Sequence, residues 1–401
     1  MNSDPTQGRG ALRAVATALA VVLAIGLSAC GGSSSSSSAA SSSAPTGGAS
    51  SSGAAVTGSS SSSAMGGTLA AQVRAAAAAI APFERTPSSI GQTQPLTRRP
   101  AGKLVDFIAD GTPIGMQILA GVQQATKALG IRLHVINQQG DTPQAIQVAW
   151  NQVLASPPAA VINAGDPSIL YHRQLAALRA RHVVAVTMFT DDDPLFSADI
   201  YGPPQYHELG TLEADYMIAK SDGHAHVLIV AVPQIQGLQG VASAIQQTIH
   251  SGCSGCTVST IDTQLSDIGR NDPARVVSYL QQNPSINWIA FIDGDTEIGV
   301  PEALRAAGIH GIQMLTGAGG SVNYAYIKSG ESTVDASQAP SFSGWALVDA
   351  TARALDGQPV HVSFLPMQFI TRQNLTFNIK QGWPDVPNFR QRFLALWGVK
   401  G

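Results

Sequence analysis

The chain has 401 residues, with 23 basic and 26 acidic side chains and a formal net charge of −3. It contains no basic stripe, so nothing indicates binding to nucleic acid. After the first 30 residues, no apolar stretch is long enough to cross a membrane.

The first 29 residues have the layout of a secretory signal peptide. Arg9 and Arg13 precede an apolar run over residues 14–26, which ends in Leu-Ser-Ala-Cys at Cys30. This is the bacterial lipobox pattern, in which small residues admit a peptidase and the Cys30 thiol accepts a diacylglyceryl group. The run is well short of the roughly 20 residues that span a bilayer. We therefore predict a lipoprotein on the cell surface, anchored through Cys30 to the outer face of the cytoplasmic membrane.

Residues 30–67 are predicted to form a flexible tether. Serine accounts for 17 of the 33 residues from 31 to 63, and the rest are glycine, alanine, proline, threonine and one valine. Such a segment cannot bury enough apolar surface to offset its ordering entropy. Residues 68–102 form an N-terminal extension of the folded part and contain an alanine-rich helix.

Two cysteines remain after Cys30, namely Cys253 and Cys256. In an exported protein an even pair predicts a disulfide. A redox-active pair and a zinc site are the alternatives. Redox-active motifs open a helix, whereas a strand is expected here, and His250 is the only histidine close in sequence. We expect a structural disulfide, no metal and no cofactor.

From residue 103 onward, apolar runs of strand length alternate with segments of helical spacing. Thr142 followed by Pro143 has the pattern of a helix start, with a capping side chain and proline in the first turn. This alternation predicts βαβ units and parallel sheets. The expected strands are residues 104–108, 131–136, 160–162, 183–188, 226–230, 257–261, 288–292, 312–315 and 332–336. The expected helices include residues 113–129, 166–181, 205–220, 236–250, 273–282 and 296–307.

The ordered part, about 300 residues, is too long for one ordinary core, so two lobes are expected. The alternation resumes after the segment 201–204, which contains Pro203 and Pro204. Open parallel sheets bind ligands beyond the carboxyl ends of their strands. Two such sheets facing each other would bring six loops to a cleft. These loops are residues 109–115, 163–166, 188–193, 232–240, 293–297 and 316–321.

Several segments, in this order and spacing, resemble periplasmic binding proteins of the ribose/galactose type, the solute receptors of ABC importers. The resemblance covers about residues 103–374. It is carried by residues 102–105 with Thr112 and Pro113, and by residues 120–125, 155–162, 293–299, 338–345 and 354–357. Residues 73–99 resemble the N-terminal extension of actinobacterial members.

This resemblance implies an α/β fold of two Rossmann-like lobes with parallel sheets, joined by a three-crossing hinge. The crossings fall near residues 201–204, 338–340 and 364–367. The expected N-terminal lobe is then residues 103–203 plus 339–365, and the C-terminal lobe residues 204–338 plus 366–401. The family also implies a small-molecule ligand, sugar-like by preference, an ABC permease as partner, and a monomer.

The family's charged sugar contacts carry over only in part. Gln338 matches the hinge glutamine, and Thr112 stands where asparagine is common. Asp293 replaces an asparagine, Gly237 an arginine and Ala318 an aspartate. The candidate ligand-binding residues are Asp110, Thr112, Phe189, Thr190, Asp191, Gln236, Gln239, Asp293, Asp295 and Gln338.

Two hypotheses for the ligand stay open. A buried polyol needs paired donors and acceptors, because each unmatched group costs about 1–3 kcal/mol. Either the aspartates and glutamines rebuild a polar site, or the ligand is less polar, such as an aromatic or lipid-like molecule. Structural roles compete as well. Asp295 is as well placed to cap a helix as to bind a ligand, Phe189 is as well placed in the core as in the cleft, and Trp345 faces either the cleft or the core.

Catalysis is not expected, because the sequence has no Gly-x-Ser-x-Gly elbow, no P-loop, and no Gly-x-Gly-x-x-Gly after the first strand. Two receptor functions remain. The protein delivers its solute to an ABC importer, or it is a sensory receptor that acts on a membrane signalling partner.

Overall fold

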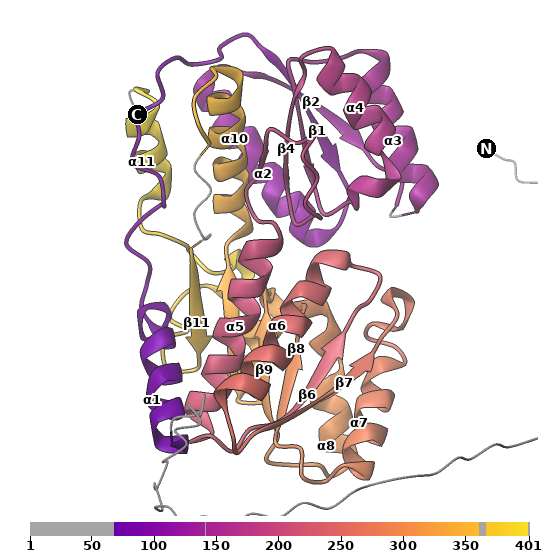
Figure 1. Cartoon of the computed structure of the whole chain (residues 1–401), viewed down its shortest axis with the longest axis vertical. Helices are drawn as coiled ribbons and strands as arrows, with labels where there is room; N and C mark the ends of the chain where they lie inside the picture. Colours follow the sequence, from indigo (N-terminus) through magenta and orange to yellow (C-terminus); the bar gives the residue numbers. More distant parts are fainter. Residues whose placement is uncertain (1–67, 141, 361–365, 400–401) are drawn as a thin grey trace, which may run out of the picture. The chain divides into compact units, whose positions relative to one another are not determined.

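Two sheets, each covered by helices on both faces, form the core of the computed structural model (Figure 1). The structure describes residues 68–140, 142–360 and 366–399. The first sheet has the strand order β2-β1-β3-β4-β5, and the second has the order β11-β10-β9-β8-β6-β7. All strand pairs are parallel except β10 with β11. The predicted α/β fold of two lobes with parallel sheets is confirmed.

Each lobe consists of one sheet and the helices that cover it; the first lobe contains the first sheet and the second lobe the second. The first lobe comprises β1 (Leu104–Ala109), β2 (Arg132–Asn137), β3 (Ala160–Ala164), β4 (Val184–Met188), β5 (Ala198–Asp199), α2 (Pro113–Leu129), α3 (Pro143–Ala155), α4 (His172–Ala180) and α10 (Pro340–Leu355). The second lobe comprises β6 (His226–Ala231), β7 (Thr257–Asp262), β8 (Trp288–Phe291), β9 (Gln313–Gly317), β10 (Val334–Gln338), β11 (Met367–Thr371), α5 (Pro203–Lys220), α6 (Gln236–Gly252), α7 (Asp272–Gln282), α8 (Val300–Ala306) and α9 (Ser321–Ser329).

The central strands β1, β3 and β4 of the first sheet are buried on both faces, which explains why they are almost continuously apolar. One face packs against α3 and α4, where the rings of Trp150 and Tyr171 stack with centroids 4.0 Å apart. The other face packs against α2 and α10. Helix α2 begins as expected, with Thr112 accepting a hydrogen bond from Gly115 N and Pro113 in the first turn.

The chain passes from one lobe to the other through short connections between elements of different lobes. Ala339 lies between β10 of the second sheet and α10, which packs against α2. An earlier passage leads from β5 to α5 through Ile200, Tyr201 and Gly202. The return from α10 to β11 includes residues 361–365, which lie outside the described residues, as does part of the third expected crossing.

Helix α11 (Phe389–Leu396) packs on the first lobe, although the sequence assigns residues 366–401 to the second. Just beyond it, the indole of Trp397 stacks on Trp345 of α10, with centroids 5.2 Å apart and planes 4° from parallel. Trp397 Nε1 also donates to Asp349 Oδ1 at 2.7 Å. Trp345 therefore faces the core and not the cleft, and it is 3% exposed.

The N-terminal extension begins on the second lobe, where α1 (Leu69–Ile80) packs against α5. Ser254, in the loop between Cys253 and Cys256, donates from its backbone N and its hydroxyl to Gln72 Oε1 at 3.0 and 3.1 Å. The two cysteines form a disulfide with their Cα atoms 5.4 Å apart. The disulfide loop thus adds a second contact for α1 beside its packing on α5.

The extension then reaches the first lobe. Leu96 N donates to the carbonyl of Leu396 at 2.9 Å, and Arg353 of α10 donates to the carbonyl of Gln94 at 2.6 Å. Arg98 forms an ion pair with Asp356. Residues 69–98 therefore contact both lobes, as Figure 1 shows for the indigo and purple part of the trace.

Two of the expected helices are interrupted. Residues 296–307 form a short 3-10 turn, η4 (Gly294–Glu297), and then α8, because Gly299 between them has a left-handed φ of 83°. Residues 166–181 likewise divide into η2 (Ser168–Leu170) and α4. The expected strand 332–336 starts later, as β10. The short strand β5 and helix α11 were not predicted.

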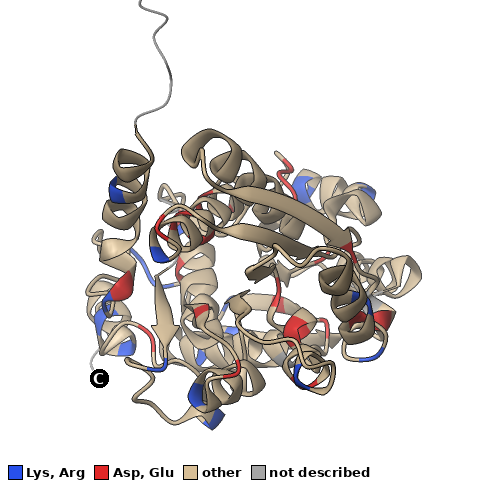
Figure 2. Cartoon of the chain, turned by 90° about the horizontal axis from the view of Figure 1, so that it is seen from below, with Lys and Arg blue, Asp and Glu red and all other residues tan. Residues whose placement is uncertain are grey.

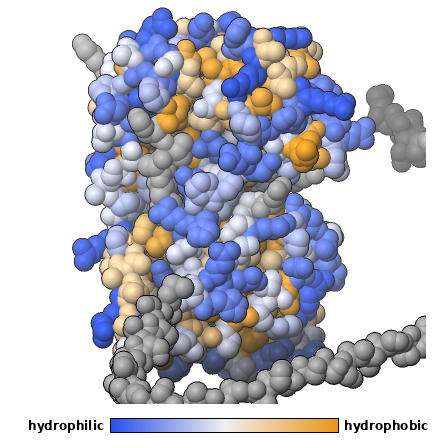
Figure 3. Space-filling view, in the orientation of Figure 1, coloured by the Kyte–Doolittle hydropathy of each residue, from blue (hydrophilic) through white to orange (hydrophobic). Residues whose placement is uncertain are grey.

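Polar residues cover most of the face seen in Figure 3, and apolar residues on it occur in small separate groups. Met116, Val148, Ile169 and Val322 are the large apolar side chains exposed within the described part. No helix among the described residues has the length and apolar character needed to span a membrane.

Candidate functional site

A pocket of about 370 Å³ lies between the loop after β4 and the first turns of α5 and α6. It therefore has walls from both lobes, next to the passage from β5 to α5. Its lining residues are Thr190, Asp191, Asp192, Pro203, Tyr206, Gly237 and Gly240. Of the ten residues predicted from sequence, Thr190 and Asp191 line this pocket.

Asp191 is held in place by hydrogen bonds from its own lobe. Ser168 N and Ser168 Oγ donate to the two carboxylate oxygens, both at 2.7 Å, and Thr190 Oγ1 lies 2.9 Å from Oδ1. Burial acts to raise the pKa of Asp191, but the hydrogen bonds from Ser168 outweigh it and leave the pKa below its usual range. The carboxylate is therefore ionised at neutral pH, and it caps η2.

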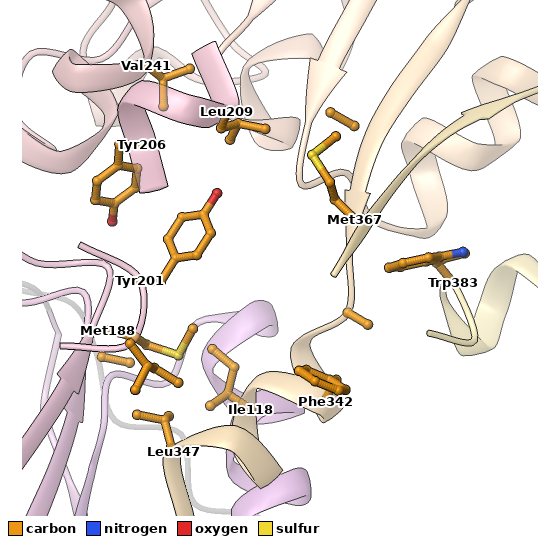
Figure 4. Packing of buried hydrophobic residues seen from close by; sticks show 14 of the residues in the cluster. Ile118, Met188, Tyr201, Tyr206, Leu209, Val241, Phe342, Leu347, Met367 and Trp383 are labelled. Carbon is orange, nitrogen blue, oxygen red and sulfur yellow. The ribbon is translucent and has the colours of Figure 1, made fainter. Parts of the chain in front are cut away.

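Three aromatic rings form the wall beside the pocket. Phe189 packs edge-to-face on Tyr201 with centroids 5.0 Å apart, and Tyr201 packs in the same way on Tyr206 at 5.2 Å. Figure 4 shows Tyr201 and Tyr206 between Met188 of the first lobe and Leu209 of the second.

Phe189 is held by its backbone as well as its ring. It has a left-handed φ of 58°, and its N–H donates to the carbonyl of Tyr201 at 2.9 Å. It is half-buried and packs against the core, and it is not among the residues that line the pocket.

Gln338 lies at the end of β10, where the chain leaves the second lobe. Its Nε2 donates to the Tyr201 hydroxyl at 2.6 Å, and its Oε1 has no hydrogen-bond partner within the described part of the chain. Gln338 is 7% exposed, so this oxygen is a buried acceptor next to the aromatic wall.

Gly237 leaves room for the ring of Tyr206. A Cβ at position 237 would lie 2.6 Å from the Tyr206 hydroxyl, closer than any side chain tolerates. The tyrosine ring thus fills the space that a longer side chain at residue 237 would need. Tyr206 is one of the lining residues that were not among the candidates from sequence, because it lies inside a helix whose apolar pattern indicates only core packing.

Asp110 and Thr112 use their polar groups locally. Asp110 accepts from Thr112 N at 3.0 Å and from Thr112 Oγ1 at 2.9 Å, while Thr112 Oγ1 accepts from Gly115 N. Together they cap α2 at the carboxyl end of β1. They do not line the pocket.

Asp293 and Asp295 follow β8 in the second lobe, away from the pocket lining. Asp293 Oδ1 accepts from Asp295 N at 2.9 Å, so Asp293 caps the short turn η4, and Asp295, for which capping was the expected alternative, does not. Burial and the nearby charge of Asp295 raise the pKa of Asp293 to about 6.

The two predicted glutamines are at the start of α6. Gln239 is exposed and donates from Nε2 to the carbonyl of Pro233 at 2.6 Å, so its amide closes its own loop. Gln236 is the first residue of the helix, and its side chain lies outside the described part of the chain.

A second polar group, not predicted from sequence, lies at the carboxyl end of the first sheet. Asp166 accepts from Gln138 Nε2 at 3.2 Å and from Asn163 Nδ2 at 2.8 Å, and Tyr171 donates to Asn163 Oδ1 at 3.2 Å. Gln138 Oε1 is buried and lacks a partner among the described residues. The signal that could have found these residues is polar side chains at the ends of otherwise apolar strands.

Residues 107–359 match the family described as the periplasmic binding protein domain. The chain belongs to this family. The resemblance drawn from the sequence is thereby confirmed. No curated protein matches the chain.

Solved structures of low sequence identity share the fold of this periplasmic binding protein. GanP, a glucose-galactose binding protein from Geobacillus stearothermophilus, is 16% identical with a TM-score of 0.61, over 69% of this chain and 99% of that chain. A solute binding protein from Agrobacterium vitis bound with alpha-D-tagatopyranose is 16% identical with a TM-score of 0.60, over 68% and 96%. One from Actinobacillus succinogenes with bound D-allose is 14% identical with a TM-score of 0.59, over 68% and 98%.

Buried carboxyl groups lie beneath the β9–α9 loop of this periplasmic binding protein. Asp335 of β10 accepts from Gly319 N at 2.7 Å and from Ser337 Oγ. Burial raises the pKa of Asp335 to about 7. Glu213 of α5 is fully buried, and neither carboxylate oxygen has a partner among the described residues. Burial, and the charge of Asp335, raise the pKa of Glu213 well above its usual range.

These acids do not form a metal centre. Among the described residues, no group of three or more His, Cys, Asp and Glu side chains is arranged to hold a metal ion. The buried acids instead support the loop that contains Ala318, whose φ is 52°.

Proposed function

We propose that the protein is an extracytoplasmic receptor, anchored by lipid on Cys30, that captures a small hydroxylated solute between its lobes and delivers it to an ABC importer. Family membership over residues 107–359, with a pocket walled by both lobes, is the observation that carries this proposal. A ligand that contacts both lobes favours the state in which they approach, because it has higher affinity for that state.

A sugar-like solute is supported by the groups that remain without partners. Gln138 Oε1 and Gln338 Oε1 are buried acceptors without partners among the described residues, one in each lobe, although neither residue lines the pocket. Relatives of the same fold were crystallised with alpha-D-tagatopyranose and D-allose. The aromatic wall offers the apolar face of a sugar ring a surface to pack on.

The test of binding is thermal unfolding of the full-length protein, extracted in detergent, against sugars, polyols and aromatic acids. A ligand at 100 times its Kd stabilises the folded state by about 2.7 kcal/mol, which gives a readily measured shift. We expect a sugar or polyol to give this shift. A shift confined to aromatic or lipid-like compounds would contradict the hydroxylated solute and favour the less polar alternative.

A variant pair locates the binding site. Tyr206→Phe removes a hydroxyl that lines the pocket, and we expect Kd for the identified ligand to rise about three- to tenfold, the value of one hydrogen bond. Tyr279→Phe makes the same change in α7, away from the pocket, and should leave Kd unchanged. Equal affinities in the two variants would place the ligand elsewhere.

The anchor and the delivery step have their own tests. Cys30 lies outside the described residues, so lipidation is measured directly, by mass spectrometry of the protein and of a Cys30→Ala variant. Delivery is measured as uptake of the labelled ligand by cells that lack the gene. Normal uptake in those cells, with loss of a transcriptional response to the ligand, would instead favour the sensory receptor.

A further inference from the structure

The pocket between the loop after β4 and helix α5 is acidic. Its lining contains the carboxylates of Asp191 and Asp192 and no lysine or arginine. The segments that follow the parallel strands contain one basic residue of these two types, Arg270, which is exposed and comes after the edge strand β7. In the ribbon of Figure 2, segments with basic residues and segments with acidic residues both occur along the described part of the chain. The pocket lining, in contrast, contains acidic residues alone.

Neither carboxylate in the lining is neutralised by a partner. The ion pairs of the described residues do not include Asp191 or Asp192. Asp191 is kept ionised by neutral donors from Ser168. Asp192 is exposed, and no hydrogen bond to its side chain is present in the described part. Both charges are thus available to a ligand.

A third acid lies nearby. Asp199, at the end of β5, has one oxygen accepting from Tyr201 N at 3.2 Å and one buried oxygen, Oδ2, without a partner among the described residues. Burial, together with the charges of Asp192 and Asp191, raises the pKa of Asp199 to about 7. Asp199 is therefore a third carboxyl group that lies close enough to Asp191 and Asp192 to interact with their charges.

The N-terminus of a helix favours anions, so the two helices that begin at the pocket could offset its negative charge. Their effect is too small to do so here. A helix contributes about half a positive charge at its N-terminus. Helix α5 begins with Pro203 and Pro204, which have no N–H to offer, so only α6 presents free N–H groups in its first turn. Half a charge does not offset two carboxylates.

The remaining wall suits a cation as well. Tyr206 lines the pocket, and Phe189 and Tyr201 extend the aromatic surface behind it. Ring faces attract ammonium groups, and more strongly where water is excluded. Thr190 has its hydroxyl committed to the Asp166 carbonyl at 2.6 Å, so the lining has no neutral side-chain donor to spare except the Tyr206 hydroxyl.

We propose that the solute carries a protonated amine on its hydroxylated frame, and that Asp191 and Asp192 bind the ammonium group beside the ring of Tyr206. This inference rests on the proposed function and narrows its ligand class to amine-bearing sugars and polyols. Such a ligand supplies the positive charge and the hydrogen-bond donors that the lining lacks.

Matched probes test the charge alone. D-glucosamine, N-acetyl-D-glucosamine and D-glucose share one ring, and only the first is cationic at pH 6.5. The galactose series provides a second set. Binding to the full-length protein is measured by calorimetry at low salt, with repeats at higher salt. We expect an amine-bearing member to bind at least tenfold more tightly than its neutral counterparts, with affinity falling as salt rises.

The variant that reports on the site is Asp192→Asn, which removes one charge and keeps the shape. We expect a three- to tenfold higher Kd for the amino sugar that binds and no change in Tm, because Asp192 has no partner to lose. Asp222→Asn removes an exposed acid at the turn after α5, away from the pocket, and serves as the control.

The outcomes separate the two proposals. Binding of a neutral sugar in preference to its amine would overturn the cationic ligand and leave the receptor function standing. Binding of an amine with equal affinity in Asp192→Asn and wild type would overturn the assignment to this pocket. If no member of the glucose or galactose series binds, including the amino sugars, the result would contradict the amine-bearing ligand. It would also leave the proposed sugar-like ligand without support.

Discussion

In the first lobe, Asp191 faces the pocket and accepts several hydrogen bonds. In the second lobe, Asp335 and Glu213 are buried and have few hydrogen-bond donors or none among the described residues. Asp191 accepts from Ser168 twice and has a lowered pKa. Asp335 has two donors but full burial, and Glu213 has none among the described residues, and both have raised pKa values. An aspartate is thus ionised in one lobe, whereas in the other lobe its protonated form is favoured. The number of hydrogen-bond donors relative to the degree of burial determines which form is favoured.

The largest effect is expected from Asp335→Asn. The folded-state pKa of Asp335 is raised from 3.8 to about 7, so its stabilising contribution is complete below pH 3.8 and is lost as pH rises to about 7. At about 1.4 kcal/mol per pH unit, the upper bound of this loss is about 4 kcal/mol. Urea unfolding from pH 4 to 8 should show a decline in wild type that is smaller in the variant. Parallel curves would contradict a proton held on Asp335.

The next largest effect is expected from Asp191→Ala in the first lobe. This change leaves the Ser168 donors without acceptors and should lower the free energy of unfolding by about 2 kcal/mol at pH 7. The exposed neighbour Asp192→Ala should change it by less than about 0.5 kcal/mol. Chemical denaturation measures both. Equal free energies of unfolding in the two variants would mean that the hydrogen bonds of Asp191 do not stabilise the first lobe.

A smaller effect is expected from Asp293→Asn in the second lobe. An asparagine keeps an oxygen for Asp295 N but removes the group whose pKa is about 6. The wild-type free energy of unfolding should fall between pH 3.8 and 6 relative to the variant, by about 1 kcal/mol after allowance for solvent screening, because Asp293 is only half-buried. If the variant instead loses stability at every pH, the capping contact outweighs the buried charge.

The sequence was sufficient to predict the strands and helices of both lobes, because these depend on patterns within a few neighbouring residues. Alternating apolar runs, and capping residues such as Thr112 and Thr142, determine strands and helix starts within a few residues. The residues of the candidate site were harder to predict, because they depend on contacts between distant parts of the chain. Tyr206 reaches the pocket only because Gly237 of a different helix leaves room for it. Trp345 was undecided between core and cleft because its partner, Trp397, lies some fifty residues further along the chain.

The family match ends at residue 359, but the fold does not. A recombinant fragment trimmed to residues 107–359 would lose Trp397 from the face of Trp345 and the Gln94 carbonyl from the buried guanidinium of Arg353. It would also lack α1, β11 and the first half of β1. Domain limits drawn from sequence families are therefore poor guides to where this protein can be cut. A boundary before residue 68 keeps every one of these contacts.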